Sequence, residues 1–283
     1  MRVLVVGASG FIGGYVMQEL LDRGHEVTGT ARSGRGRPGF VALDITDSES
    51  CREALRIEDF EAVINLAGVG VSAGSASTDQ MDRVNRLGSS VLAKAALSAP
   101  SGPWFVNAAS STEVPEGVRP ESQYGASKAR GTDAVAAEFA EADTAYASAV
   151  IHNTYGPDQP AGRFVMSVFE NLGSGQPMAI HFPQRVRDFC FVNDVAEKLA
   201  EIVENPATER VEREIGTGVG TTLWDAAEMI RSRIGADESL LRTEEPQMED
   251  GHRFGVADPE DAGFALCATS LADGIEIVAE ELL

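Results

Sequence analysis

Tyr124 and Lys128 are the two side chains in this sequence whose types and spacing best suit proton transfer. Residues four apart share one face of a helix. A lysine ammonium close to a phenol favours the phenolate and lowers a pKa that is ordinarily about 10. A tyrosine tuned in this way can give or take a proton near neutral pH. Lys128 is also one of only three lysines in the chain.

A cluster of hydroxyl side chains, Ser110, Ser111 and Thr112, precedes this pair and follows the apolar segment 104–108. A hydroxyl at such a place can hold the oxygen of a substrate while a proton moves. The alternative is that these side chains only cap the end of a strand.

Three glycines at three-residue intervals, Gly7, Gly10 and Gly13, follow an apolar run at residues 2–6. The pattern predicts a buried strand, a tight turn and the start of a helix. Gly7 can take backbone angles closed to other residues, Gly10 lets a pyrophosphate approach the backbone, and Gly13 lets helix and strand lie close. The helix N-terminus would direct unpaired N–H groups at phosphates. The motif therefore predicts dinucleotide binding.

Strand and helix patterns alternate along the first two thirds of the chain, which predicts a parallel sheet with helices on both faces. Ligands of such sheets bind outside the carboxyl ends of the strands. The expected strands span residues 2–6, 26–30, 40–43, 62–66, 104–108 and 145–151. The expected helices span residues 13–23, 48–56, 81–98, 124–140, 164–172, 195–204, 223–234 and 271–282.

The alternation weakens after about residue 155, where Tyr155-Gly-Pro-Asp-Gln-Pro160 is typical of a loop. We expect an α/β fold, a Rossmann-like doubly wound parallel sheet with a small C-terminal substrate-binding cap. Residues 1–155 form the expected dinucleotide-binding domain. Residues 156–283 form most of the cap, with some segments returning to the core.

Composition limits the partners. The net charge is −21 at pH 7, which argues against nucleic acid or an anionic membrane surface as a partner. No apolar run is long enough to span a bilayer, and the N-terminus does not have the pattern of a signal peptide, so a cytoplasmic location is expected. Cys51, Cys190 and Cys267 have no metal-ligand or disulfide spacing, so reduced, buried thiols and no metal are expected.

The ordered set of motifs resembles the extended short-chain dehydrogenase/reductase superfamily, in its NAD(P)-dependent nucleotide-sugar epimerase/dehydratase branch. The resemblance covers nearly the whole length. It rests on Gly7-Ala-Ser-Gly10-Phe-Ile-Gly13, Leu43-Asp44-Ile45, Asn65-Leu-Ala-Gly68, Val84-Asn85 with Gly88, Ser110-Ser111-Thr112 with Tyr124 and Lys128, Asn153-Thr-Tyr155-Gly-Pro157, and Arg187-Asp188-Phe189 with Val192 and Asp194.

The resemblance implies roles for individual residues. Tyr124 would be the acid/base, Lys128 would bind the nicotinamide ribose and tune Tyr124, and a hydroxyl would hold the substrate oxygen. The family pattern counted back from Val114 selects Ser111 for that hydroxyl, with Ser110 and Thr112 as alternatives. The implied cofactor-binding residues are Gly7, Ser9, Gly10, Phe11, Ile12, Gly13, Arg32, Asp44, Ile45, Leu66, Ala67, Gly68, Asn85, Tyr124 and Lys128. The implied substrate-binding residues are Ser111, Thr112, Asn153 and Arg187.

The end of the second expected strand bears on the choice of cofactor. It reads Thr30-Ala-Arg32-Ser33, with Arg35 and Arg37 just beyond. A carboxylate there would bind the adenosine ribose hydroxyls of NAD. This chain has arginines instead, which suit a 2′-phosphate. We therefore expect NADP in preference to NAD, unless these arginines only decorate a surface loop.

Arg187 and Asn153 could bind the diphosphate of a substrate, although Asp188 or Asp194 could instead pair with Arg187. His152 is expected to have a hydrogen-bonded core role. Two departures argue against dehydration. Val114-Pro115-Glu116 replaces the usual tyrosine-glycine pair, and Thr112-Glu113 only partly resembles the dehydratases' acidic pair.

The expected function is an NADPH-dependent ketoreductase acting on a keto group, most plausibly carbon 4 of a nucleoside-diphosphate (deoxy)sugar. The alternatives are a nucleotide-sugar 4-epimerase with bound NAD, a reductase of a non-sugar ketone, and a non-catalytic NADP-binding regulator. The resemblance also implies a homodimer formed through the helices expected at 81–98 and 124–140.

Overall fold

The computed structural model describes residues 1–33, 37–72, 74–113, 122–244, 255–261 and 263–282. The chain divides into two compact units. The first unit comprises Met1–Ile151 and Ala196–Arg213, and the second comprises His152–Val195 and Glu214–Leu283.

The large sheet has the strand order β13-β10-β6-β5-β4-β1-β2-β3, and from β6 to β3 every neighbouring pair is parallel. The order reverses between β1 and β4, which is where sheets of this kind bind ligands. Its strands are β1 (Arg2–Val6), β2 (Glu26–Ala31), β3 (Phe40–Ala42), β4 (Ala62–Asn65), β5 (Trp104–Ser110), β6 (Ala147–Ile151), β10 (Val211–Gly216) and β13 (Phe264–Leu266).

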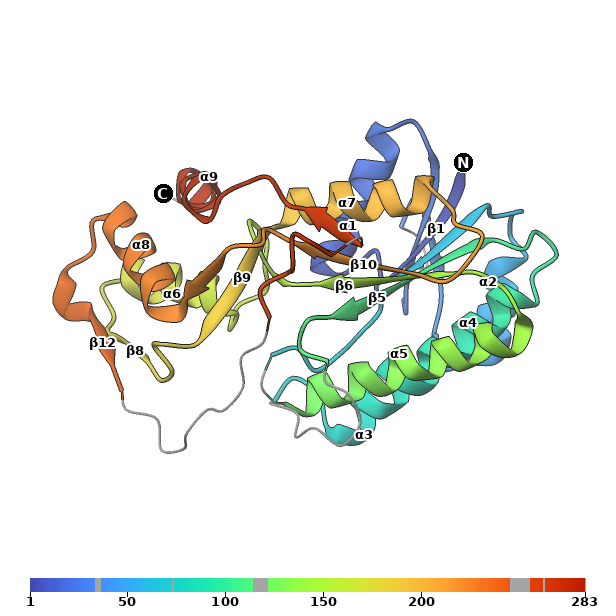
Figure 1. Ribbon diagram of the computed structural model, residues 1–283, viewed down its shortest axis with the longest axis horizontal. Coiled ribbons are helices and arrows are strands. Elements are labelled where there is room, and N and C mark those ends of the chain that lie inside the picture. The colour runs from blue at the N-terminus through green and yellow to red at the C-terminus, as the bar shows by residue number, and fades with distance from the viewer. Residues whose placement is uncertain (34–36, 73, 114–121, 245–254, 262, 283) are drawn as a thin grey trace. The chain divides into compact units, whose positions relative to one another are not determined.

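Helices cover both faces of the first unit's sheet, as the alternation predicts. Figure 1 shows α4 and α5 side by side on one face and α1 and α7 on the other. The helices are α1 (Phe11–Asp22), α2 (Ser48–Leu55), α4 (Ser89–Leu97), α5 (Gln123–Ala142) and α7 (Val192–Glu204). The expected Rossmann-like doubly wound α/β fold is confirmed.

The core beneath α4 and α5 is built on aromatic packing. The rings of Phe105 on β5 and Phe139 on α5 lie 5.3 Å apart, and those of Phe139 and Tyr146 lie 4.7 Å apart. All three residues are buried, with Leu4, Leu92 and other apolar side chains around them. This packing fixes α5 against the sheet and so determines where its first turn lies.

The helix expected at residues 81–98 is continuous but irregular. It comprises α3 (Thr78–Met81), a π-helical segment η1 (Asp82–Gly88) and α4. Ser77 and Gln80 form a capping box at its start. A Cβ at Gly88 would lie 2.7 Å from the Ile45 side chain, so the glycine allows close packing at the wider turn. The hydrophobic pattern does not distinguish a π turn from an α turn, which is why the sequence did not predict it.

Within the described residues, the second unit has two small sheets and the helices α6, α8 and α9. One sheet has the order β11-β9-β7, and β8 pairs with β12 in the other. The elements are β7 (Asn153–Tyr155), α6 (Phe164–Gly173), β8 (Met178–Ile180), β9 (Val186–Phe191), β11 (Gly220–Thr222), α8 (Leu223–Ile234), the 3-10 turn η2 (Glu238–Leu240), β12 (Leu241–Thr243) and α9 (Leu271–Leu282). Their apolar side chains form a core of their own around Tyr155, Phe169, Phe189 and Ile230.

The three cysteines are buried and unbridged, as expected. In the part of the chain that the structure describes, no helix has the length and apolar character needed to cross a membrane. The same described residues contain no cluster of three or more His, Cys, Asp or Glu side chains that could hold a metal ion.

Candidate active site

The glycine turn after β1 is shaped by close backbone approaches. Gly7 has φ of +86°, and a Cβ there would lie 2.8 Å from the backbone nitrogen of Ala67. A Cβ at Gly13 would lie 2.2 Å from the carbonyl oxygen of Gly7. The first glycine therefore lets the loop after β4 come close, and the third lets α1 lie against the turn, as the motif predicts.

Between these two contacts the backbone of the turn is exposed at the N-terminus of α1. Gly10 caps α1 without any side-chain hydrogen bond, and its own N–H donates to Gly7 O at 2.9 Å. Ser9 and Gly10 are exposed. The first N–H groups of a helix have no partner within it, and they attract anions. The segment from Gly7 to Gly13 thus fits a dinucleotide pyrophosphate.

The ends of β2 and β3 bring Arg32 and Asp44 within electrostatic reach of each other. The Asp44 carboxylate accepts hydrogen bonds from the N–H and the hydroxyl of Thr46, at 2.9 and 2.8 Å. Partial burial raises the pKa of Asp44, but the Thr46 hydrogen bonds and the charges of Arg83 and Arg32 outweigh this and lower it. A carboxylate fixed in this way can accept hydrogen bonds from an adenine or a ribose.

Two neighbouring side chains have structural roles here. Ile45 is buried against Gly88, and the Arg37 guanidinium lies 3.9 Å from the centre of the Phe40 ring. Arg35 lies outside the described residues.

The loop after β4, with Leu66, Ala67 and Gly68, is held by buried amides. The Asn65 Nδ2 donates to Asn107 Oδ1 at 3.0 Å and to Ser89 Oγ at 3.2 Å. The Asn85 side chain accepts from the N–H of Val69 and donates to its carbonyl oxygen, both at 2.9 Å. Asn85 is fully buried, so in this structure it positions the loop; a direct contact with the cofactor stays a prediction.

Asn107 and Ser89 are positioning residues that the sequence analysis missed. The register of the sheet pairs Asn65 with Asn107, at matched places on β4 and β5. A polar residue inside each of two apolar strands was the available signal, because buried amides need partners.

The turn after β5 separates the three candidate hydroxyls. The Ser110 and Thr112 hydroxyls lie 2.9 Å apart and hydrogen-bond to each other, and the Thr112 N–H donates to Ser110 Oγ at 3.3 Å. Among the described residues, the Ser111 hydroxyl forms no hydrogen bond, while its N–H donates to Ile151 O at 3.1 Å. Ser111 is thus the member of the cluster whose hydroxyl is available to a ligand.

Helix α5 brings Tyr124 to this turn. The Ser122 hydroxyl caps the helix by accepting the Gly125 N–H at 3.0 Å. A Cβ at Gly125 would lie 2.3 Å from the carbonyl oxygen of Thr112, so only glycine allows the first turn of α5 to approach so closely. Tyr124, half-buried, is therefore placed beside the hydroxyl cluster.

Lys128 follows one helical turn later and points inward. It is 6% exposed, and its Nζ donates to the carbonyl oxygen of Ala108 at 2.6 Å, two residues before the end of β5. Burial lowers the pKa of Lys128, and the charge of Glu113 opposes this. Glu113 is a further residue of the candidate site. Burial raises the pKa of its carboxyl group, although the positive charge of Lys128 acts to lower it.

The candidate phosphate ligands lie on two adjacent strands of the second unit. Asn153 on β7 pairs with Phe189 on β9, so Asn153 and Arg187 are diagonal neighbours on one face of this sheet. The Asn153 amide donates to Asp188 O at 3.4 Å, and Arg187 is 7% exposed.

Asp188 and Asp194 each accept hydrogen bonds from other segments of the second unit. Fully buried Asp188 accepts the N–H groups of Thr217, Gly218 and Ala257 at 2.9 to 3.2 Å, and the Thr217 hydroxyl at 2.5 Å. Asp194 accepts the N–H and hydroxyl of Thr269, at 2.6 and 2.9 Å. These carboxylates therefore fix the loop after β10 and the start of α9.

His152 has the hydrogen-bonded, buried role that was expected. Its Nε2 lies 2.8 Å from a carboxylate oxygen of Glu214. The replaced tyrosine-glycine pair at Val114-Pro115-Glu116 lies outside the described residues.

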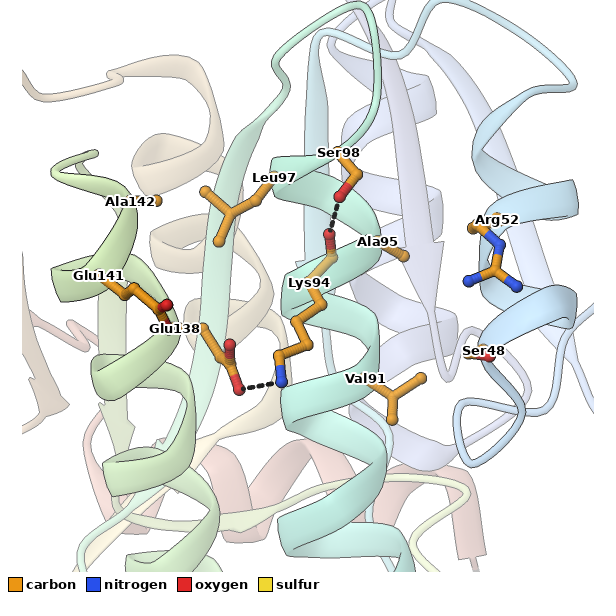
Figure 2. A pocket seen from close by; sticks show the side chains of 10 residues that line it. All are labelled: Ser48, Arg52, Val91, Lys94, Ala95, Leu97, Ser98, Glu138, Glu141 and Ala142. Carbon is orange, nitrogen blue, oxygen red and sulfur yellow. Dashed lines mark hydrogen bonds and ion pairs between the residues drawn. The ribbon is translucent and has the colours of Figure 1, made fainter.

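A hollow of about 440 Å³ lies elsewhere, between α2, α4 and α5 (Figure 2). Its lining includes Ser98 and Ala142, at the C-terminal ends of α4 and α5. Tyr124 stands at the opposite end of α5, which has 20 residues and is about 30 Å long. This hollow is therefore not part of the candidate site around Tyr124.

Comparison with known proteins identifies the family. The model of the NAD dependent epimerase/dehydratase family matches residues 3–216. The chain belongs to this family. It is thus an enzyme of the short-chain dehydrogenase/reductase type, as the sequence motifs predict.

Individual proteins similar to this chain are named as epimerases. The chain is 28% identical over 255 residues to a putative UDP-glucose 4-epimerase of Methanocaldococcus jannaschii, covering 82% of each. It is 28% identical over 265 residues to a UDP-glucose 4-epimerase of Mycolicibacterium smegmatis, covering 84% of each. The crystal structure of a Thermus thermophilus UDP-glucose 4-epimerase in complex with NAD matches with a TM-score of 0.77, at 25% identity, covering 99% of this chain and 98% of that one.

Proposed function

We propose that this family member oxidises or reduces a secondary alcohol or ketone at carbon 4 of a nucleotide sugar. The observation that carries the proposal is the arrangement after β5, where Ser111 keeps a hydroxyl without a partner among the described residues and Gly125 brings Tyr124 to the same turn. The substrate class is supported by the relatives, which are named as UDP-glucose 4-epimerases.

The chain's own groups would divide the work. The Ser111 hydroxyl would orient the substrate oxygen, and Tyr124 would give it a proton or take one away. Lys128 would favour the phenolate and so lower the barrier to that transfer. The segment from Gly7 to Gly13 would hold the pyrophosphate of a nicotinamide dinucleotide, which when bound supplies or accepts hydride. Arg187 and Asn153 would bind the substrate diphosphate.

At the finer level we propose an NADPH-dependent ketoreductase. The support is at the end of β2, where Ala31 and Arg32 stand in place of a carboxylate and Arg32 lies within reach of Asp44. A guanidinium suits the 2′-phosphate of NADP. The NAD in the Thermus thermophilus complex favours the second candidate, a 4-epimerase that keeps NAD bound.

One experiment separates the two candidates. The protein is mixed with NADPH and a UDP- or dTDP-linked 4-keto sugar, and separately with UDP-glucose and NAD. A ketoreductase consumes NADPH in step with loss of the ketone and leaves UDP-glucose unchanged. An epimerase converts UDP-glucose to UDP-galactose without net change in the absorbance of reduced nicotinamide. Failure of both reactions, in protein that binds cofactor, would contradict a nucleotide-sugar substrate.

We also propose that the protein is a homodimer that pairs through η1, α4 and α5. Leu87 on η1 is 42% exposed, and the small residue Ala137 on α5 is exposed as well. Light scattering combined with size exclusion tests this: a mass near twice 30.0 kDa is expected, and a mass of one chain contradicts it.

A further inference from the structure

Glu113 makes two hydrogen bonds to Ser110 across the turn that carries Ser111, one through its backbone N–H and one through its carboxylate. The Glu113 N–H donates to the carbonyl oxygen of Ser110 at 2.9 Å, and the Ser110 N–H donates to Glu113 Oε1 at 2.8 Å. At the end of β5, the Ser110 N–H therefore bonds to a side-chain carboxylate instead of to a backbone carbonyl oxygen. The path of the chain from Ser110 to Glu113 is fixed by this pair of bonds.

The same carboxylate acts on a buried charge. Lys128 forms no ion pair within 4.0 Å in the part of the chain that the structure describes, although it is 6% exposed. Glu113 is the carboxylate whose charge favours the ammonium there. The charged groups that act on Glu113 are Lys128 and Asp133, both on α5, and Asp133 acts in the opposite sense. A buried ammonium with one hydrogen bond to a carbonyl needs such compensation to stay protonated.

We propose that Glu113 is a positioning residue for the proton transfer at Tyr124, acting through Ser111 and Lys128. Its hydrogen bond to the Ser110 N–H holds the turn in the conformation that leaves the Ser111 hydroxyl available. Its negative charge stabilises the Lys128 ammonium, one helical turn from Tyr124. Since the role concerns this reaction, the inference rests on the proposed function.

Two substitutions separate the hydrogen bond from the charge. Glu113→Gln keeps an oxygen that can accept the Ser110 N–H but removes the charge. Glu113→Asp keeps the charge but is one methylene too short for the same hydrogen bond. Thermal unfolding of each variant checks that it is folded.

The decisive measurement follows the lysines directly, without any substrate. Protein labelled at the lysine ε-carbon gives only three signals, from Lys94, Lys128 and Lys198. We expect Glu113→Gln to lower the pH at which the Lys128 signal titrates by roughly one unit. Glu113→Asp should leave it near the wild-type value. The matched control is Glu138→Gln, which removes the partner 3.2 Å from Lys94 and should shift only the Lys94 signal.

Turnover gives the second readout. In Glu113→Gln the alkaline limb of the kcat profile should move to lower pH with the Lys128 titration. In Glu113→Asp the profile should keep its position, while kcat falls about tenfold because Ser111 is less well placed. An unchanged Lys128 titration in Glu113→Gln overturns the proposal. The proposal is also overturned if Glu113→Gln abolishes turnover while Lys128 titrates as in the wild type, because Glu113 would then carry the proton directly. Absence of wild-type turnover would instead contradict the proposed function and leave the titration test standing.

Discussion

The Asn85 amide donates a hydrogen bond to the Ser127 hydroxyl at 2.8 Å, and that hydroxyl donates to the carbonyl oxygen of Tyr124 at 2.7 Å. The π-helical segment η1 is thereby connected to the first turn of α5. The same amide holds Val69 in the loop after β4. One buried side chain therefore links the loop after β4 to the helix that carries the proposed acid/base.

Asn85→Ala should destabilise the protein and weaken cofactor binding together. The change leaves the N–H and carbonyl of Val69 without their buried partner, which costs about 3 kcal/mol and lowers Tm by roughly 6–12 °C. Differential scanning calorimetry and cofactor titration measure the two effects. Asn205→Ala is the control, since the amide of Asn205 donates to Glu201 O at an exposed site. Unaltered Tm in Asn85→Ala would show that this amide does not hold the loop.

Tyr124→Phe should abolish turnover and spare binding. Without its hydroxyl the side chain cannot exchange a proton with the substrate oxygen, so kcat should fall by roughly 100- to 10,000-fold. Cofactor affinity, measured by fluorescence titration, should stay within a few fold of wild type. Tyr146→Phe is a matched control, because the buried Tyr146 hydroxyl has no hydrogen-bond partner among the described residues. Full activity in Tyr124→Phe would remove this tyrosine from the mechanism.

The parts of the fold that the sequence predicted are those fixed by neighbouring residues. The approach of Gly13 to the Gly7 carbonyl depends on residues within one short segment, and it appears as expected. Helices 223–234 and 271–282 match α8 and α9 because each has an apolar face with helical period. The parallel pairing of the strands from β6 to β3 follows from the alternation of strands and helices.

The features that escaped prediction depend on distant contacts. Asp188 is satisfied by Thr217, Gly218 and Ala257, which no local pattern connects to β9. The hydrogen bond between the Ser110 and Thr112 hydroxyls also escaped prediction, because the residue types do not show which hydroxyls of the cluster bond to each other. Strands of three residues, such as β8 and β12, are too short to show alternation.

Arg32→Ala should reduce the affinity for NADP and leave that for NAD unchanged. The guanidinium would bond to the 2′-phosphate, and loss of a charged hydrogen bond of about 1.5–3 kcal/mol corresponds to roughly a 10- to 150-fold weaker Kd. Calorimetric titration with both cofactors gives the two constants. Arg37→Ala serves as control, because Arg37 stacks on Phe40. A parallel loss of affinity for NAD and NADP would contradict a role for Arg32 in selecting the phosphate.

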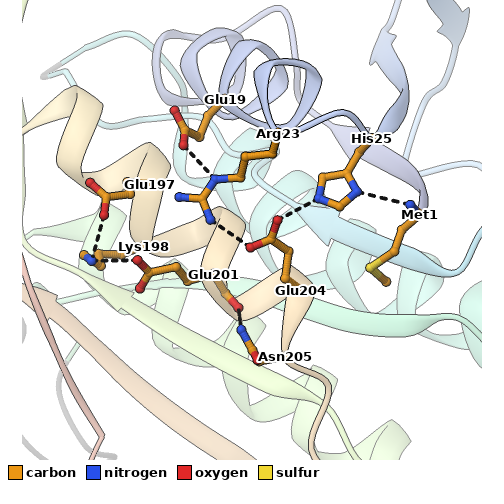
Figure 3. Close-up of polar contacts among 9 residues, drawn as sticks. All are labelled: Met1, Glu19, Arg23, His25, Glu197, Lys198, Glu201, Glu204 and Asn205. Atoms are coloured by element: carbon orange, nitrogen blue, oxygen red, sulfur yellow. Dashed lines mark hydrogen bonds and ion pairs between the residues drawn. The ribbon is translucent and has the colours of Figure 1, made fainter.

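Glu204 at the end of α7 gives a prediction on pH. Figure 3 shows its carboxylate between His25 and Arg23, with both contacts at 2.8 Å, while the Met1 amino group lies 3.1 Å from the other ring nitrogen of His25. The His25 hydrogen bond, together with Arg23 and against partial burial, lowers the pKa of Glu204 below its ordinary 4.5. The carboxylate therefore stabilises the fold above that pH, and the effect is lost as the pH falls through the lowered pKa.

Glu204→Gln should accordingly lower Tm at pH 7, and this difference should shrink as the pH falls below 4.5 and wild-type Glu204 takes up a proton. An ion pair this exposed contributes about 1 kcal/mol, so the difference at pH 7 should be roughly 2–4 °C. Thermal melts of both proteins across this range measure it. Glu141→Gln, at the end of α5 and outside this network, corrects for the loss of one negative charge. A Tm difference that stays the same as the pH falls from 7 through this range would mean that the ionised carboxylate does not anchor α7, because only a charge-dependent contact disappears on protonation.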